Sequence, residues 1–225
     1  MSWHRDLLED KGALFAGLTT LTILIGGVAE IVPMYAGPTE ATPITPYTPL
    51  EVAGRDIYVR EGCYTCHSQM IRPLDHETLR YGPWTRAWEY TYDRPFQLGS
   101  RRIGPDLQRV GGKYPDAWHW AHLMDPRSTS PGSVMPQYTW LMRDEYDPAD
   151  VTASVAGLAT LGTPYEDTSL AGVTAALDKQ SAEIVGRLAT AKVDANPRLE
   201  AVALISYLQR LGVDGKRELA KEGVK

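Results

Sequence analysis

The chain has two cysteines, Cys63 and Cys66, and His67 follows the second one directly. The run Cys-x-x-Cys-His is the attachment motif of a c-type haem. In such a site two thioethers hold the porphyrin edge and the imidazole of the histidine binds the iron. One turn of helix would bring the three side chains to the same face. The motif therefore predicts one covalently bound haem c, attached to Cys63 and Cys66, with His67 as an axial ligand, and any fold of this chain must accommodate that group.

Two other sites could use the same cysteines. A dithiol redox motif would normally lie in a βαβ pattern, which the surrounding sequence lacks. A zinc site is the stronger alternative, because His119 and His122 lie one helical turn apart and would complete a Cys2His2 set with Cys63 and Cys66. The chain would then be a zinc-stabilised interaction module without redox chemistry. The histidine directly after the second cysteine favours haem, since zinc does not require it.

An electron-transfer haem usually has a second axial ligand, either a thioether or another imidazole. Met135 lies in Ser-Pro-Gly-Ser-Val-Met-Pro, where the prolines and the glycine impose a non-helical path that can cross a haem face. Met124 follows Trp118 in a predicted short helix, and its expected role is packing. We therefore predict Met135 as the second ligand, with His122 as the alternative.

Residues 12–35 form one long apolar segment. No charged residue occurs from Gly12 to Ala29, and apolar residues continue after Glu30. At about 1.5 Å per residue, a helix of this length spans about 36 Å, enough to cross the hydrocarbon core of a bilayer. Gly27-Val28-Ala29 resembles the cleavage site of a signal peptide, but the apolar run is longer than a usual signal core. We predict a retained N-terminal transmembrane helix.

Charged residues around this segment predict its orientation. Arg5 and Lys11 precede it, whereas the first basic residue after it is Arg55. By the positive-inside rule, residues 1–11 lie in the cytoplasm and the haem domain lies outside. The formal net charge is −5 and no basic run occurs, so we expect no nucleic-acid partner.

The segment after the membrane helix is rich in proline. Pro38, Pro43, Pro46 and Pro49 would make residues 36–53 an extended spacer. About 190 residues remain beyond the anchor, the usual size of one domain with insertions. We place this domain at residues 54–215 and a charged tail at residues 216–225.

Two predicted helices bracket the domain. The first runs from Gly54 to Cys63, and the second begins at Asn196-Pro197 and ends at Gly212. In this second helix, apolar residues recur at helical spacing: Ala201, Leu204, Ile205, Leu208 and Leu211. With the haem motif and the methionine loop, these helices resemble the class I cytochrome c fold, so the predicted fold class is mainly α.

Two regions exceed what that fold needs. Residues 68–103 are rich in Tyr and Trp, and we expect this aromatic insertion to fold back on the haem or to dock a partner. Residues 147–193 read as a helical insertion of two helices, capped by Asp147-Pro148 and by Ser169. The second helix has an apolar stripe formed by Val173, Leu177, Ile184 and Leu188.

The segment Gly104-Pro105-Asp106-Leu107 strengthens the resemblance to class I cytochromes c. In that family the proline carbonyl accepts a hydrogen bond from the axial imidazole, which implies that Pro105 orients His67. Arg101 and Arg102 lie just before this segment. We hypothesise that they contact haem propionates or a partner; the alternative is that they are solvated surface arginines.

Several longer sequence segments resemble a more specific family than class I cytochromes c in general. These segments are residues 62–73, 80–83, 92–96, 99–102 and 104–107. They resemble subunit II of cbb3-type cytochrome c oxidases, a membrane-anchored monohaem cytochrome, and the match extends from the anchor to the closing helix. Many members have Trp at the position of Leu98 and Lys at that of Arg101, which puts the details of a partner contact in doubt.

This resemblance implies an electron relay. A further cytochrome c subunit or a soluble cytochrome c would donate electrons, and this haem would pass them to the catalytic haem-copper subunit, which reduces oxygen. It also implies that Met135 is the distal ligand and that the chain lies in the bacterial inner membrane with its haem domain in the periplasm. With both axial positions filled, this chain itself would perform no oxygen chemistry. A free membrane-anchored electron-shuttle cytochrome and the cytochrome subunit of a nitric oxide reductase are the alternatives.

Overall fold

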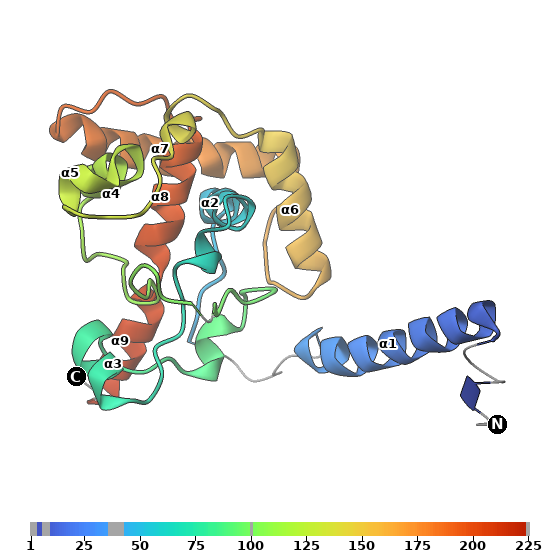
Figure 1. Ribbon diagram of the computed structural model, residues 1–225. Helices are drawn as coiled ribbons and strands as arrows, with labels where there is room; N and C mark the ends of the chain where they lie inside the picture. The colour runs from blue at the N-terminus through green and yellow to red at the C-terminus, as the bar shows by residue number, and fades with distance from the viewer. Residues whose placement is uncertain (1–3, 6–9, 36–42, 100, 224–225) are drawn as a thin grey trace. The chain divides into compact units, whose positions relative to one another are not determined.

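The computed structural model describes residues 4–5, 10–35, 43–99 and 101–223. It divides into two compact units, Met1–Ala41 and Thr42–Lys225, which we describe separately. Helices joined by turns and loops make up the described residues (Figure 1). β pairing among them is limited to an isolated bridge between Glu145 and Leu199. The predicted mainly α fold class is confirmed.

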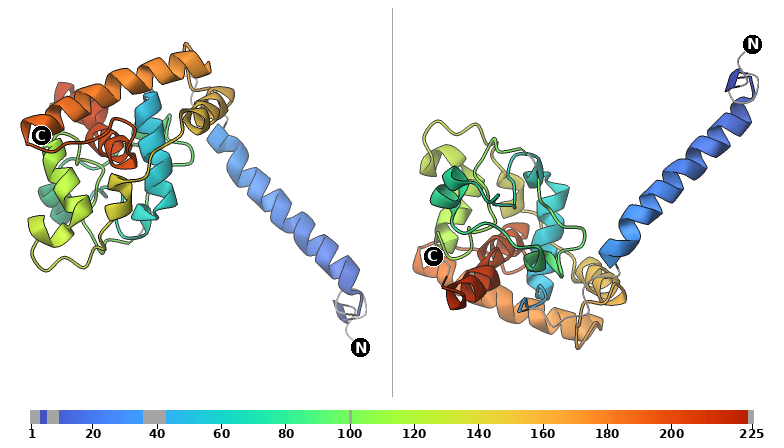
Figure 2. Two further views of the ribbon diagram at one scale, coloured as in Figure 1. Left: turned by 90° about the horizontal axis from the view of Figure 1, so that it is seen from above. Right: turned by 90° about the horizontal axis from the view of Figure 1, so that it is seen from below.

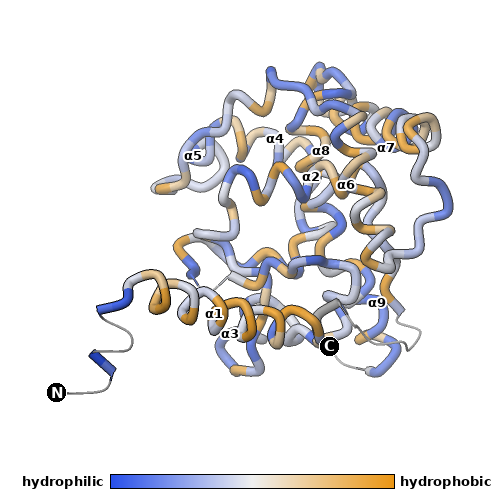
Figure 3. Tube along the Cα trace, turned by 90° about the vertical axis from the view of Figure 1, so that its right-hand side faces the viewer, coloured by the Kyte–Doolittle hydropathy of each residue, from blue (hydrophilic) through white to orange (hydrophobic). Residues whose placement is uncertain are grey.

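The first unit contains the helix α1 (Gly12–Tyr35). Its segment Gly12–Pro33 is long and apolar enough to cross a membrane. Figure 3 shows hydrophobic residues along most of this helix. We therefore describe α1 as a candidate membrane anchor. The predicted cytoplasmic residues 1–11 and the predicted spacer 36–53 lie partly outside the described residues.

The helix α2 (Pro49–Arg60) begins five residues before the predicted start at Gly54. A capping box starts it: the Thr48 side chain accepts from the backbone of Glu51, and the Glu51 carboxylate accepts from the Thr48 backbone at 2.8 Å. Pro49 suits the first turn, because its missing N–H would have no helical partner there. Residues 49–53 are therefore helical, which corrects the predicted extent of the spacer. The helix ends before Cys63.

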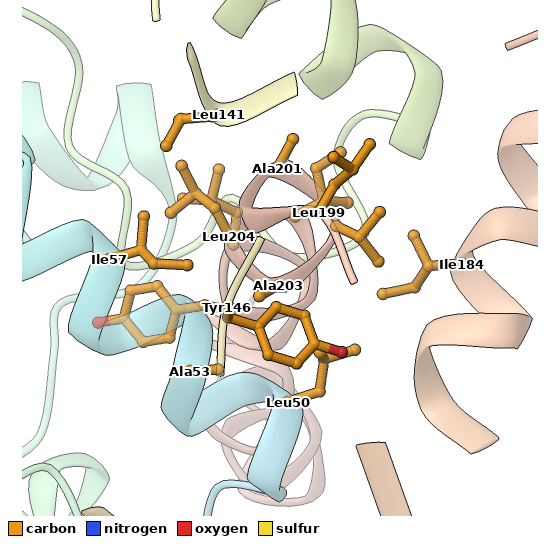
Figure 4. Close-up of a cluster of buried hydrophobic side chains, with 14 of the residues drawn as sticks. Leu50, Ala53, Ile57, Leu141, Tyr146, Ile184, Leu199, Ala201, Ala203 and Leu204 are labelled. Atoms are coloured by element: carbon orange, nitrogen blue, oxygen red, sulfur yellow. The ribbon is translucent and has the colours of Figure 1, made fainter. Parts of the chain in front are cut away.

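The centre of the second unit is the crossing of α2 with α8 (Glu200–Arg210). Residues 201–205 of α8 are all at most 1% exposed, so this helix is buried around its circumference. A Cβ atom at Gly54 would lie 2.0 Å from the carbonyl oxygen of Ala203. Only glycine allows the two backbones to approach this closely. Figure 4 shows Ala53 and Ile57 of α2 facing the α8 side chains.

The closing helix begins at Glu200 and not at Asn196-Pro197, so the predicted N-cap is wrong. The Asn196 side chain instead accepts from the backbone of Arg198 at 2.9 Å, which forms a turn. The backbone of Arg198 accepts from Tyr146, so this turn pairs with a distant segment. Tertiary contacts therefore override the local helix-capping pattern of Asn196-Pro197.

The helical insertion consists of α6 (Pro148–Thr160) and α7 (Leu170–Thr190). Both predicted caps are present: Asp147 accepts from the backbone of Ala149, and Ser169 accepts from that of Gly172. The four stripe residues of α7 are buried. α7 packs against α2, α4 (Asp116–Met124), α6 and α8, and it runs along one side of the second unit (Figure 2). This insertion extends the core.

Much of the predicted charged tail is the helix α9 (Val213–Lys221). Leu219 is 1% exposed, and the buried Asp214 carboxylate accepts from the backbone and the hydroxyl of Thr45 at 2.8 Å. The helix follows Gly212, whose φ of 72° favours glycine. Residues 213–221 are therefore part of the packed unit.

The aromatic insertion is fixed to the core by two ion pairs between buried residues. Arg55 donates from Nε to Asp93 at 2.5 Å, and Arg109 donates from Nη2 to Glu89 at 2.7 Å. Each pair joins this insertion to a segment outside it. Short helices within the insertion are α3 (Asp75–Tyr81) and η3 (Ala87–Tyr90).

Candidate haem-binding site

A tight turn after α2 presents the two cysteines. Gly62 has a φ of 69°, and the helix η2 (Cys63–Thr65) follows it. The carbonyl oxygen of Cys63 accepts from the backbone N–H of Cys66 at 3.1 Å and of His67 at 2.9 Å. Both thiols are free. Burial, together with the Glu61 carboxylate, raises the pKa of the Cys63 thiol to about 12.

Cys63, Cys66 and His67 line a cavity of about 510 Å³. Other members of its lining are Leu107, Leu204 and Leu208, which supply apolar surface. The volume lies within the range usual for cofactor pockets. A macrocycle that is mostly apolar needs such a lining, and two unpaired thiols in the wall provide the attachment points of a c-type haem. The donor set and the cavity therefore fit a haem.

A contact with the backbone of Pro105 orients the imidazole of His67. Its Nδ1 lies 2.9 Å from the carbonyl oxygen of Pro105, to which it can donate a hydrogen bond. With the proton on Nδ1, the lone pair of Nε2 is available to a metal. Burial lowers the pKa of His67, which favours the neutral ring. Gly104 leaves space for the ring, because a Cβ atom there would lie 2.2 Å from the His67 Cε1.

Met135 and His122, the two predicted candidates for the second ligand, both lie in the cavity wall. Met135 is partly buried against the core. The His122 ring stacks on Trp118 with centroids 4.6 Å apart, and its Nδ1 lies 2.6 Å from the hydroxyl of Thr129. His122 is therefore fixed by two neighbours within the wall.

The zinc alternative is not supported. Within the described part of the chain, no group of three or more His, Cys, Asp or Glu side chains is placed to hold a metal ion. His119 lies in the same cavity as the cysteines but does not assemble with them into a Cys2His2 site. The spacing of His119 and His122 along α4 is compatible with such a set. Their distance from Cys63 and Cys66, however, depends on tertiary packing.

Arg101 and Arg102 are absent from the described lining of the cavity, and their contact with haem propionates or a partner stays a prediction. Arg101 is exposed. Arg102 donates from Nε to Ser68 and from Nη2 to Glu77, both at 2.7 Å, and lies 3.7 Å from Asp106. The guanidinium therefore joins the segment after His67 to the segment before Gly104.

Two groups beside the site were not predicted from the sequence. Glu77 is 1% exposed, and hydrogen bonds from Arg102 and Arg72 lower its pKa to about 2. Tyr114, Trp118 and His122 form an aromatic stack along the cavity wall, with the first two centroids 4.0 Å apart. Their four-residue spacing is the signal that could have revealed the stack. Nothing in the local sequence marks the partners of Glu77.

The chain matches the family described as cytochrome c oxidase, mono-haem subunit/FixO, over residues 4–214. This range includes α1, the cavity-lining residues and α8. No curated protein matches the chain. A one-haem subunit agrees with the single pair of cysteines in the cavity wall. The chain belongs to the FixO family of mono-haem cytochrome c oxidase subunits.

Proposed function

We propose that this chain is the electron-relay subunit of a cbb3-type cytochrome c oxidase and carries one covalent haem c. The cavity that joins Cys63, Cys66 and His67 is the observation that carries the proposal. The bound haem would supply one-electron exchange at its iron. Cys63 and Cys66 attach it through thioethers, and Pro105 holds His67 in the orientation that offers Nε2 to the iron.

Met135 completes the coordination in this proposal. Its unbranched thioether lies on a loop in the cavity wall, whereas the His122 ring is stacked and hydrogen-bonded in place. A thioether ligand raises the reduction potential relative to a second imidazole. With His67 and Met135 both holding the iron, this chain would not itself reduce oxygen, and that reaction would belong to the catalytic haem-copper subunit.

The membrane arrangement is part of the same proposal. α1 is the single-pass anchor in the bacterial inner membrane, with the N-terminus in the cytoplasm and the haem domain in the periplasm. A further cytochrome c subunit or a soluble cytochrome c donates electrons from that side. Because the cavity lies in the second unit, both electron donor and catalytic subunit are expected to contact that unit.

The test is spectroscopy of the full chain, matured with c-type haem and purified in mild detergent. Haem that survives acidic acetone extraction and a narrow α band on reduction are expected. Met135→Ala should abolish the near-infrared sulfur-to-iron band and lower the midpoint potential, whereas His122→Gln should retain the band. A full-strength band in Met135→Ala would exclude the ligand assignment.

Assembly is tested on the complex. Mild purification should co-isolate a multi-haem, copper-containing catalytic subunit, and oxygen consumption with reduced cytochrome c should fall in the complex carrying Met135→Ala. A haem-loaded chain that purifies alone would support a free electron shuttle, and co-isolation of a nitric oxide reductase would support that enzyme instead.

A further inference from the structure

The loop that carries Met135 is attached to α4 at both of its ends. Before the loop, the hydroxyl of Thr129 lies 2.6 Å from Nδ1 of His122. After the loop, the backbone N–H of Tyr138 donates to the carbonyl oxygen of Leu123 at 2.9 Å. His122 and Leu123 are neighbours in α4, so the two attachments lie side by side. The loop therefore leaves α4 and returns to it beside His122, with Met135 between the two attachments.

The ring of His122 is fixed within the cavity wall. It lines the same cavity as Met135 and stacks on Trp118, with 4.6 Å between the centroids and 11° between the planes. Stacking and the contact at Nδ1 together restrict rotation of the ring. The other ring nitrogen, Nε2, has no hydrogen-bond partner among the described residues. His122 therefore holds one unpartnered nitrogen at a fixed place in this wall.

The hydroxyl proton of Thr129 decides which tautomer of His122 is present. This hydroxyl has two acceptors within reach, Nδ1 of His122 at 2.6 Å and the carbonyl oxygen of Pro126 at 3.3 Å. The Pro126 carbonyl already accepts from the backbone N–H of Ser130 at 2.9 Å. The shorter contact and the free acceptor both favour donation from the hydroxyl to Nδ1. An Nδ1 that accepts a hydrogen bond carries no proton.

The remaining ring proton must then lie on Nε2. Burial, and then the nearby His67, lower the pKa of His122, so the ring is neutral and carries a single proton. A neutral imidazole protonated at Nε2 has no lone pair there to offer to a metal, but it can donate a hydrogen bond. The contact with Thr129 thus makes His122 a donor and argues against its being the second axial ligand.

A thioether sulfur is an acceptor that such a donor can use. We propose that His122 is a positioning residue for Met135, and that it donates a hydrogen bond from Nε2 to the Met135 sulfur while that sulfur binds the iron. The inference rests on the proposed function, because it requires the haem and ligation by Met135. A hydrogen bond withdraws electron density from the sulfur, which disfavours the electron-poor ferric iron. His122 therefore raises the reduction potential of the relay.

Substitutions at His122 separate a hydrogen-bond donor from a residue that only packs. His122→Leu removes the donor, whereas His122→Gln keeps a side-chain N–H close to the position of Nε2. Redox titration of the full chain, loaded with haem, should give a lowered midpoint potential in His122→Leu and a nearly unchanged one in His122→Gln. The near-infrared sulfur-to-iron band should persist in both variants and shift in His122→Leu. His76→Leu is the matched control and should leave the potential unchanged, because His76 is exposed on α3 and is absent from the described cavity lining.

NMR spectroscopy of the ferrous, unsubstituted chain locates the ring proton directly. Nitrogen-15 correlation spectra should show the proton of His122 on Nε2, and nuclear Overhauser contacts should join this proton to the side chain of Met135. If His122→Leu fails to load haem, this measurement decides the assignment alone.

A proton on Nδ1 of His122, or an unchanged potential in haem-loaded His122→Leu, would overturn the inference and leave the proposed function intact. Equal lowering of the potential in His122→Leu and His122→Gln would show that the ring acts by packing, which would also overturn it. Absence of covalent haem from the unsubstituted chain would instead overturn the proposed function.

Discussion

Replacing Gly104 by alanine should displace the imidazole of His67. The new Cβ atom would lie 2.2 Å from Cε1, 2.6 Å from Nδ1 and 2.7 Å from Nε2 of that ring. Ordinary contacts begin at 3.4 Å, so the ring or the Gly104 backbone must move by about 1.2 Å. A displacement of this size breaks the 2.9 Å hydrogen bond from Nδ1 to Pro105.

Two terms set the size of the effect. Overpacking a tightly filled site costs about 1–3 kcal/mol, and losing the hydrogen bond costs about 0.5–1.5 kcal/mol. We therefore expect the second unit to lose about 2–4 kcal/mol of unfolding free energy. The reoriented ring should also bind the iron more weakly, since losing the partner that orients a ligand typically costs about 10–100-fold in metal affinity.

Guanidinium unfolding of the haem-loaded chain in mild detergent, followed by the haem absorption, measures the first effect. The matched control is Gly186→Ala in α7, where a Cβ atom meets nothing within 4 Å. Alanine in a helix interior should stabilise that variant by about 0.5–1 kcal/mol. The steric argument is refuted if Gly104→Ala unfolds at the same guanidinium concentration as Gly186→Ala and its α band is unchanged.

Three further substitutions test the scaffold. Gly54→Ala should destabilise the second unit by about 1–3 kcal/mol or more, because its Cβ atom would lie 2.0 Å from the Ala203 carbonyl at the α2–α8 crossing. Chemical unfolding measures this, with Gly157→Ala as the control. Arg55→Met should cost about 3–5 kcal/mol, because the Asp93 carboxylate stays buried without its partner. The double variant with Asp93→Asn should recover part of that loss. Glu77→Gln should cost about 2–3 kcal/mol at neutral pH, since the ionised carboxylate holds two arginines and its pKa is lowered to about 2. This contribution is complete above the ordinary pKa of about 4.5 and is lost as the pH falls towards 2, so the stability curves of the two proteins should converge there.

Each of these predictions has a clear contrary result. Equal stability of Gly54→Ala and Gly157→Ala would mean that the helices can separate at no cost. Additive losses from Arg55→Met and Asp93→Asn would show that the two side chains do not depend on each other. A constant difference between the native and Glu77→Gln curves from pH 7 to pH 2 would contradict the lowered pKa of Glu77.

Helix positions show where local sequence signals suffice. The caps at Asp147 and Ser169 were predictable, because each side chain bonds a backbone group two or three residues away. Asn196-Pro197 carries a similar signal, yet it forms a turn, since residue 198 pairs with residue 146 across the fold. The early start of α2 was missed although its capping box is local, because the prolines of this region suggested an extended spacer.

The sequence by itself determined the chemistry of this protein: an apolar segment long enough for a membrane, two cysteines with a following histidine, and a methionine on a proline-bounded loop. Those features depend on residue type and short spacing, which a linear pattern records. Only the tertiary structure decided what surrounds them. Arg102 donates a hydrogen bond to Glu77, and Lys216, from a predicted tail, donates one to the carbonyl oxygen of Gly111. Long charged side chains take the partners that folding places within reach, and these partners lie far away in the sequence.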